Sequence, residues 1–196
     1  MPLFTLLAMT IFRTLRLSVL GVALSLGATS CLNAPDYSDT PEIEFNRVDY
    51  TIEFDQDRQT DFDSFNIVVN FKDGDGNLGL DDSETNPPYA RYQADNVTLN
   101  RFHNNYFIQI FQRLPGGNWE PFIADPSNPT NNYDGRYPLL NPDGREQPLR
   151  GDLSYKGVRF SRGTIRSGTQ LRFEVTIADR ALNVSNTVVS EPVTVR

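Results

Sequence analysis

The sequence of 196 residues contains one cysteine, Cys31, and one histidine, His103. A single histidine excludes a zinc site built from several imidazoles, and any Ser-His-Asp triad would have to use His103. That residue lies in a polar stretch, residues 100–105, which we expect to be a surface loop. The sequence also lacks a Walker loop, a dinucleotide-binding fingerprint and a nucleophile elbow. Since no catalytic signature remains, we expect a protein that is not an enzyme.

Apolar runs long enough to cross a membrane are missing as well. One uncharged apolar run, residues 17–30, follows Arg13 and Arg16 and ends in small residues directly before Cys31. A cationic flank, an apolar stretch and small residues in this order predict a secretory signal that is cut before the cysteine. The alternative is a transmembrane anchor, but the run is shorter than the roughly 20 apolar residues that a spanning helix needs.

This N-terminal segment resembles the signal of bacterial lipoproteins, in which the cysteine after the cleavage site carries lipid. Ala28 departs from that pattern, which usually has leucine three residues before the cysteine. The resemblance implies that Cys31 carries a covalent lipid and anchors the protein to a membrane of the bacterial cell envelope, which we expect to be the outer membrane. A start at Met9 would put the charged flank first, as in ordinary signals. An acylated Cys31 has no thiol left for a disulfide or for nucleophilic chemistry.

Basic residues are fewer than acidic ones in the remaining chain. Removal of residues 1–30 leaves 16 basic and 25 acidic side chains, a net charge of about −9. An acidic surface repels a phosphate backbone, and no basic stripe interleaved with aromatic residues compensates for it. We therefore expect no nucleic-acid partner. The length suits one domain with an ordinary core.

We expect three parts: a signal peptide at 1–30, a lipidated N-terminus with a flexible tether at 31–41, and one domain at 42–196. The tether contains two prolines and little apolar periodicity, which is typical of a linker. Its acidic residues, Asp36 and Asp39, also resemble the surface-export signal of Bacteroidota lipoproteins. Both interpretations of these acids stay open.

Apolar residues in the expected domain alternate with period two, which predicts strands with one buried face. The clearest strands are residues 65–71 and 171–177. Weaker candidates are 43–54, 105–114, 118–123, 153–160 and 187–195, and no long helix competes with them. Pro192 cannot donate a ladder hydrogen bond, so the last of these runs should lie at an edge or a bulge. About seven short strands with turn-rich connections predict an antiparallel β-sandwich of immunoglobulin or fibronectin type.

Two stretches without strand patterns, 72–96 and 124–150, are longer than usual connections, and function is often found in such loops. The first contains oxygen-bearing side chains at positions 1, 3, 5, 9 and 12 of a twelve-residue segment, namely Asp73, Asp75, Asn77, Asp81 and Glu84. This is the ligand spacing of calcium loops, although position 6 is Leu78 instead of glycine. We predict a structural calcium site. The alternative is a solvated turn in which these side chains bind their own backbone.

The second long stretch suggests an aromatic surface. Tyr133 and Tyr137 lie among polar residues, and Trp119 is close before them in sequence. Together they could form a platform for a sugar or a peptide, or they could pack on the sandwich and cap its open end.

Asp179 and Asn183 bracket the expected final hairpin, and we expect them to form a turn.

A wider resemblance rests on three segments, FKDGDGNLGLDDSETNPPY, NYDGRYPLLNPDGREQPLRGDLSY and IADRALNVSNTV. They are similar to segments of a group of small Bacteroidota lipoproteins of unknown function. The last segment also resembles the end of many bacterial immunoglobulin-like domains. The resemblance implies an envelope location and a β-rich fold, and it implies no activity.

Three functions follow from these observations. The first is a non-enzymatic envelope lipoprotein that binds a partner or has a structural role, with a loop stiffened by calcium. The second is a glycan-binding accessory protein that uses Trp119, Tyr133 and Tyr137. The third is a carboxylate-dependent hydrolase, because paired carboxylates are recognised by their separation in space and acidic residues are plentiful. The partner, protein or glycan, is not specified by the sequence.

Overall fold

The computed structural model describes residues 35–125, 127 and 133–196. In this part of the chain the structure contains eight strands and one 3-10 helix, η1. Their bounds are β1 (Glu42–Asp55), β2 (Thr60–Asp73), η1 (Arg101–His103), β3 (Tyr106–Arg113), β4 (Trp119–Pro121), β5 (Leu149–Ser161), β6 (Gln170–Ile177), β7 (Val188–Val189) and β8 (Val193–Thr194). The prediction of an all-β domain is confirmed.

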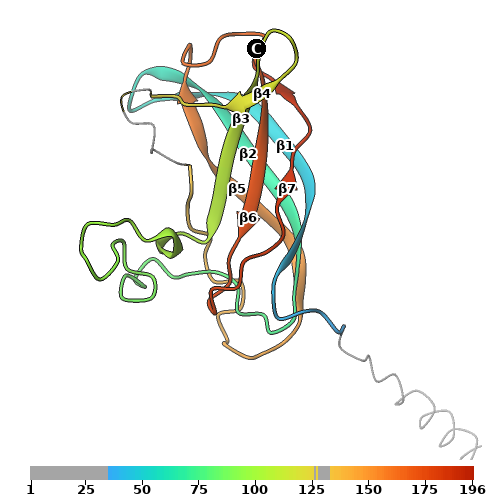
Figure 1. The fold of residues 1–196 in the computed structure, drawn as a ribbon. Helices are drawn as coiled ribbons and strands as arrows, with labels where there is room; N and C mark the ends of the chain where they lie inside the picture. The colour runs from blue at the N-terminus through green and yellow to red at the C-terminus, as the bar shows by residue number, and fades with distance from the viewer. Residues whose placement is uncertain (1–34, 126, 128–132) are drawn as a thin grey trace, which may run out of the picture. The chain divides into compact units, whose positions relative to one another are not determined.

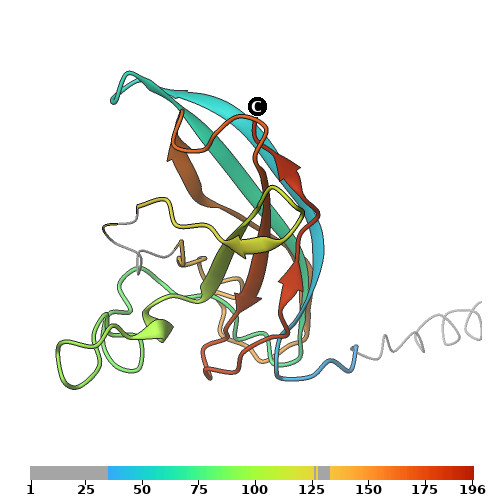
Figure 2. The same ribbon diagram turned by 45° about the horizontal axis from the view of Figure 1, so that its top comes forward.

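The strands form two antiparallel sheets, which face each other as a β-sandwich (Figures 1 and 2). One sheet has the order β1-β2-β5, and the other has the order β4-β3-β6-β7, with β8 also pairing with β6. Immunoglobulin-type sandwiches divide a Greek key between their sheets in the same manner, with the third and sixth strands paired at the centre of one sheet. The predicted fold class is therefore confirmed, and the structure supplies the strand order.

Alternating side chains of both sheets fill the space between them. The burial of β6 alternates strictly, and Phe173 and Ile177 are completely buried. From the opposite sheet, Phe65, Ile67 and Val69 enter the same core cluster. Burial of each large apolar side chain contributes about 1.5–3 kcal/mol to stability, so this shared core holds the two layers together.

The last predicted strand, residues 187–195, is divided into β7 and β8. Between them the Ser190 hydroxyl accepts a hydrogen bond from Phe173 N at 2.9 Å, in place of a backbone carbonyl. Pro192 follows, and it has no N–H to donate. The side-chain hydrogen bond and the proline interrupt the ladder, so the run forms two short strands on β6.

One asparagine joins the edges of the two sheets. The Asn186 side chain accepts a hydrogen bond from Ile43 N and donates one to Ile43 O, each at 2.8 Å. Asn186 lies two residues before β7, and Ile43 lies in β1. The amide therefore makes both hydrogen bonds that a neighbouring strand residue would make.

The two long loops pair with each other. Leu80 N donates to Tyr137 O at 3.0 Å, and Leu140 N donates to Leu78 O at 3.1 Å. Leu78 and Leu80 are buried beneath this contact. Gly79 has φ +99°, and a Cβ there would overlap the Pro138 carbonyl oxygen, so only glycine fits. The segment after β2 is thus firmly packed.

The predicted signal peptide and Cys31 lie outside the described residues. Of the predicted tether, Pro35 onward belongs to the same compact unit as the sandwich, and Ser38 O accepts a hydrogen bond from Gly74 N at 2.7 Å. The end of the tether is therefore packed against the segment that follows β2. Among the described residues, no helix is long and apolar enough to cross a membrane.

Candidate metal centre

Asp73, the last residue of β2, is the centre of the most unusual polar site. Its side chain is 0% exposed, and neither carboxylate oxygen has a hydrogen-bond partner among the described residues. A buried polar group without a partner costs about 1–3 kcal/mol, and more if it is charged. Such a group needs a compensating ligand or must hold a proton.

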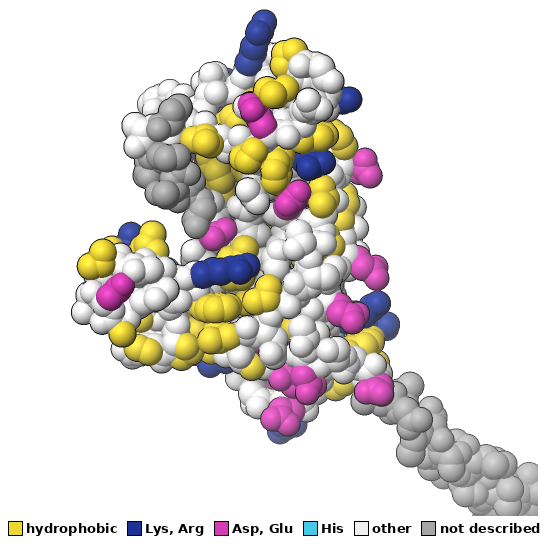
Figure 3. Space-filling view, viewed as in Figure 1, with side chains coloured by type: hydrophobic (Ala, Val, Ile, Leu, Met, Phe, Trp, Pro, Cys, Tyr) yellow, Lys and Arg dark blue, Asp and Glu magenta, His cyan; other side chains and the backbone are white. Residues whose placement is uncertain are grey.

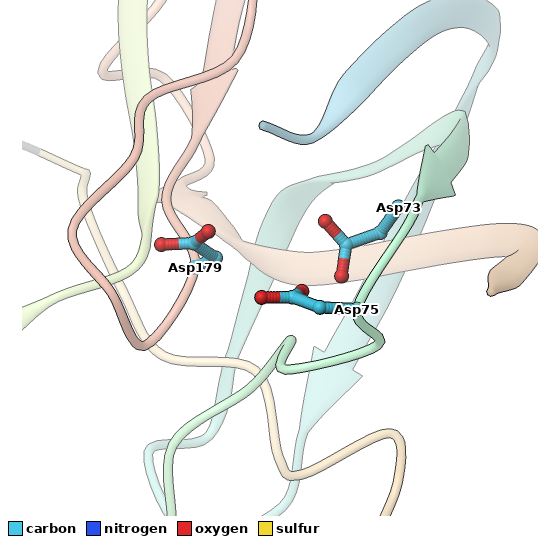
Figure 4. Close-up of side chains that lie close together, drawn as sticks. All are labelled: Asp73, Asp75 and Asp179. Atoms are coloured by element: carbon cyan, nitrogen blue, oxygen red, sulfur yellow. The ribbon is translucent and has the colours of Figure 1, made fainter. Parts of the chain in front are cut away.

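Two further carboxylates lie beside Asp73. Asp75 follows it in the same loop, and Asp179 comes from the loop after β6 (Figure 4). One oxygen of each of the three residues lies within 4.8 Å of the others. Asp179 is itself 2% exposed. Three carboxylates so close together repel one another unless a cation or protons offset their charge.

Asn77 adds a fourth oxygen from the same loop. Its side-chain N–H₂ group donates to Asp75 Oδ2 at 2.6 Å, whereas its Oδ1 is buried and has no partner. The unpartnered acceptors of Asp73 and Asn77 belong to the same segment as Asp75. Carboxylate and amide oxygens are the ligands that hard divalent cations prefer. The residues present therefore fit a calcium ion.

The charges of the cluster change its titration. Burial, followed by the charges of Asp75 and Asp179, raises the pKa of Asp73 to about 7. Burial is also the main reason that the pKa of Asp179 is raised, although hydrogen bonds from Asn183 oppose the shift. A bound cation would remove the repulsion and lower these pKa values.

The other two predicted ligands are not brought to this cluster. Asp81 accepts hydrogen bonds from Ser83 N at 2.9 Å and from the Ser83 hydroxyl at 2.5 Å, as in a local turn. Glu84 forms a two-pronged ion pair with Arg180, with both contacts at 2.6 Å. Leu78 turns into the core instead of the calcium loop. Only Asp73, Asp75 and Asn77 of the predicted set come together.

The sequence interpretation placed Asp179 in a turn, and the structure shows that this residue has two roles. Its carboxylate accepts hydrogen bonds from Asn183 N at 2.7 Å and Nδ2 at 2.8 Å, so the turn exists. The same carboxylate belongs to the acidic cluster. Asp179 lies two residues after β6, and its proximity to the end of β2 could have been predicted only if the packing of the two sheets had been known.

The three aromatic residues predicted as a platform do not share one surface. Tyr137 is 2% exposed, and its hydroxyl donates to Ala178 O at 3.0 Å. Tyr133 is half-buried and packs on Phe160, with ring centroids 5.1 Å apart. Trp119 is half-buried against the Arg172 guanidinium. Tyr137 is therefore a core residue, and it cannot contact a surface ligand.

Arg136, which lies between Tyr133 and Tyr137 in the second long loop, organises the segment that contains His103. Its guanidinium donates to the carbonyl oxygens of Asp81, Glu84 and Tyr89 at 2.9–3.2 Å. It also donates to His103 O at 2.5 Å. The His103 ring lies beside Tyr89 O and Arg136. These contacts explain why the segment is ordered without regular strands.

Comparisons with protein-family models, with curated proteins and with solved structures find no match for this chain. The function is therefore inferred from the sequence and the geometry of the molecule.

Proposed function

We propose that the protein is a cell-envelope lipoprotein whose β-sandwich is a non-enzymatic binding or structural module stiffened by calcium. The observation that supports the metal is Asp73, a completely buried carboxylate with two unpartnered oxygens beside two further carboxylates. A cation would satisfy these oxygens and offset three negative charges at once. No hydrogen bond from the surrounding chain does so.

Calcium suits the donors better than other common cations. Zinc sites are built from cysteine and histidine, with carboxylates in addition, whereas these donors are all oxygens. Magnesium demands a small octahedral site and retains several waters, whereas calcium accepts six to eight oxygens in flexible geometry. Water or backbone carbonyls would complete the coordination. Extracellular calcium modules bind with dissociation constants of roughly 0.1–1 mM, and we propose an affinity in that range.

The role of calcium in this proposal is structural. Asp73 and Asp75 follow β2 in one sheet, whereas Asp179 follows β6 in the other. An ion shared between them would hold the two layers together at this end of the sandwich. The segment after β2 also contacts Ser38 and residues 137–140. Stiffening the site would therefore stabilise the whole loop region.

The proposed location rests on the N-terminal segment, with lipid on Cys31 as the membrane anchor. Cys31→Ser should abolish lipid attachment and release the protein from the membrane fraction. Intact mass of membrane-extracted protein measures this directly. A mature chain that begins before Cys31 and has no acyl mass would contradict the proposal.

Thermal unfolding tests the calcium site. The full chain should melt at a higher temperature in 5 mM calcium than in chelator, and magnesium at the same concentration should have a much smaller effect. Asp73→Asn should remove the calcium response, whereas Asp143→Asn, a change of an exposed acid, should leave it intact. An unchanged melting temperature in calcium, or an equal response to magnesium, would overturn the proposal.

One observation supports a second candidate, the carboxylate-dependent hydrolase. Asp134 and Glu174 both line a cleft that is separate from the acidic loop. Asp134 accepts a hydrogen bond from Ile108 N at 2.9 Å, and Glu174 lies 3.6 Å from Arg172. Release of reducing ends from a polysaccharide would identify this activity, and loss of it in Glu174→Gln would assign it to the cleft.

A further inference from the structure

The outer face of the five-stranded sheet contains one aromatic and three polar side chains that pair across β3 and β6. Phe107 and Gln109 of β3 point away from the core, as do Glu174 and Thr176 of β6, because their neighbours in sequence fill the interior. Gln109 is the cross-strand partner of Glu174, and Phe107 is the partner of Thr176. These four side chains therefore form two adjacent rows on one surface.

A cleft of about 470 Å³ lies over these rows. Arg101 of η1 borders it on one side, and Pro121, Phe122 and Ile123 border it on another. Figure 3 shows the hollow on the left of the molecule, where a basic side chain lies along hydrophobic ones. The volume is within the range of about 300–1,000 Å³ that is common for small-molecule sites.

Arg101 is held in position with its donors available. Its guanidinium lies 4.2 Å from the centroid of the Phe107 ring. A cation–π contact of this kind is worth about 0.5–1 kcal/mol at an exposed site, and it restricts the side chain. No hydrogen bond engages the guanidinium within the described residues. Its charge acts on the neighbouring Asp134 carboxylate, and the guanidinium, which has five N–H donors, lines the cleft where a ligand could accept from it.

The base of the cleft offers both donors and acceptors. The Gln109 amide makes no side-chain hydrogen bond to the described residues, and Glu174 has only the 3.6 Å contact with Arg172. The Thr176 and Thr187 hydroxyls lie 3.1 Å apart. Ile123, at 49% exposure, gives the cleft an apolar wall. Each carboxylate of the cleft has a cation nearby, Arg172 for Glu174 and Arg101 for Asp134, so the site has no excess positive charge that would attract an anion.

We propose that this cleft binds a neutral saccharide. Sugar hydroxyls both donate and accept, so they can bind Arg101, Gln109 and Glu174 together. The C–H face of a sugar ring can pack against Ile123 and the neighbouring apolar residues. An apolar ligand would leave the polar groups at the base unpaired, which is costly. Of the three aromatic residues that the sequence suggested, Tyr133 lines this cleft, whereas Tyr137 and Trp119 do not.

The inference goes beyond the proposed function, because it names a ligand for the binding module. It uses no residue of the Asp73 cluster. The melting test with calcium contains no polysaccharide, and a saccharide test needs no metal response. Failure of one proposal is therefore visible without failure of the other.

Affinity gel electrophoresis of the full chain in detergent tests the proposal. Gels contain xylan, mannan or pullulan as neutral probes, and polygalacturonate as the anionic probe. We expect retardation by at least one neutral polymer. The double variant Arg101→Ala with Gln109→Ala should bind at least 10-fold more weakly, and Gln109→Trp, which fills the cleft, should lose retardation. The matched controls Arg150→Ala and Gln56→Ala change exposed residues elsewhere, and they should bind as the wild type does.

Four outcomes would overturn the inference. They are no retardation in any neutral gel, retardation by polygalacturonate alone, equal binding by the double variant that melts normally, and equal binding by Gln109→Trp. Polygalacturonate binding alone would indicate charge capture by arginine. Release of reducing ends from a retained polymer would overturn a purely binding role and support the hydrolase instead.

Discussion

The two halves of the segment from Asp73 to Glu84 contain similar oxygen donors and use them differently. In the first half, Asp73 is buried with two unpartnered oxygens. In the second half, Asp81 binds the nearby Ser83, and Glu84 pairs with Arg180. Asp81 and Glu84 each have a partner of their own, and Asp82 is exposed. In the first half, no described residue satisfies the two oxygens of Asp73, and the proposed cation would do so.

The difference shows that the spacing of acidic residues does not decide which of them bind a metal. The end of a buried strand carries Asp73 into the interior, where no described arginine pairs with it. In the second half, a local turn satisfies Asp81, and Arg180 from another loop satisfies Glu84. Local partners therefore decide which acids of the segment stay unpaired, and the proposed calcium site would use only half of the calcium-loop pattern.

The largest expected effect is a pH dependence confined to the first half. The pKa of Asp73 is raised to about 7 from 3.8, so between about pH 4 and pH 7 the native state holds a proton that the unfolded state has lost. Stability of the metal-free protein should therefore fall as pH rises through this window, by roughly 2–4 kcal/mol. Urea unfolding in chelator at pH 5 and pH 8 measures the change.

Asp73→Asn provides the control for that experiment, because the amide does not titrate. The variant should be more stable than the wild type in chelator at pH 8, and its pH dependence should be smaller. A wild-type stability that rises between pH 5 and pH 8 in chelator would contradict the raised pKa of Asp73 in the native state.

The next largest effect is stabilisation by calcium at pH 8. At a concentration 100 times its dissociation constant, a ligand adds about 2.7 kcal/mol to stability. For a domain of this size the melting temperature should rise by about 5–10 °C. Differential scanning calorimetry measures the shift. Asp179→Asn should reduce it as strongly as Asp75→Asn does, although these residues lie in different loops; a full response in Asp179→Asn would remove that residue from the site.

A smaller effect is expected for the ion pair of the second half. Glu84→Gln should cost about 1 kcal/mol, because the pair is two-pronged but partly exposed. Calcium affinity, measured by isothermal titration calorimetry, should stay within about twofold of the wild type. A tenfold loss, about 1.4 kcal/mol of binding free energy, would mean that Glu84 is a ligand after all, as the sequence spacing suggested.

The smallest effect is expected for Asp81→Asn. Asparagine keeps an oxygen that can accept the Ser83 hydrogen bonds, so the free energy of unfolding should change by less than about 0.5 kcal/mol. The calcium response should also remain. Chemical denaturation with and without calcium checks both points, and a reduced calcium response would contradict the division of the segment into two halves.

The sequence predicted the strands well where burial alternates without interruption. Residues 171–177 are the best example, since every second side chain enters the core. The run 187–195 was harder, because Ser190 replaces a ladder carbonyl with its hydroxyl. Composition reveals neither that exchange nor the pairing of both resulting strands with β6. The strand order likewise depends on contacts between residues far apart in sequence.

The same limit applies to the sites. Asp73, Asp75 and Asn77 were predicted because they are close in sequence, but Asp179 reaches the cluster only through the packing of one sheet against the other. Tyr137 looked like a surface residue among polar neighbours, yet its backbone bonds to Asn105 draw it into the core. The cleft over Gln109 and Glu174 was not predicted, because it depends on the register of two strands.

The Asn186 amide that spans the two sheet edges has a mechanical consequence. A force pulling at the N-terminal side of the domain is transmitted first into β1, whose backbone at Ile43 is bonded to this side chain. Peeling β1 away must break those two bonds together with the β1–β2 ladder. The force is thereby shared with the C-terminal strands, so this one amide resists the separation of β1 from the rest of the sandwich.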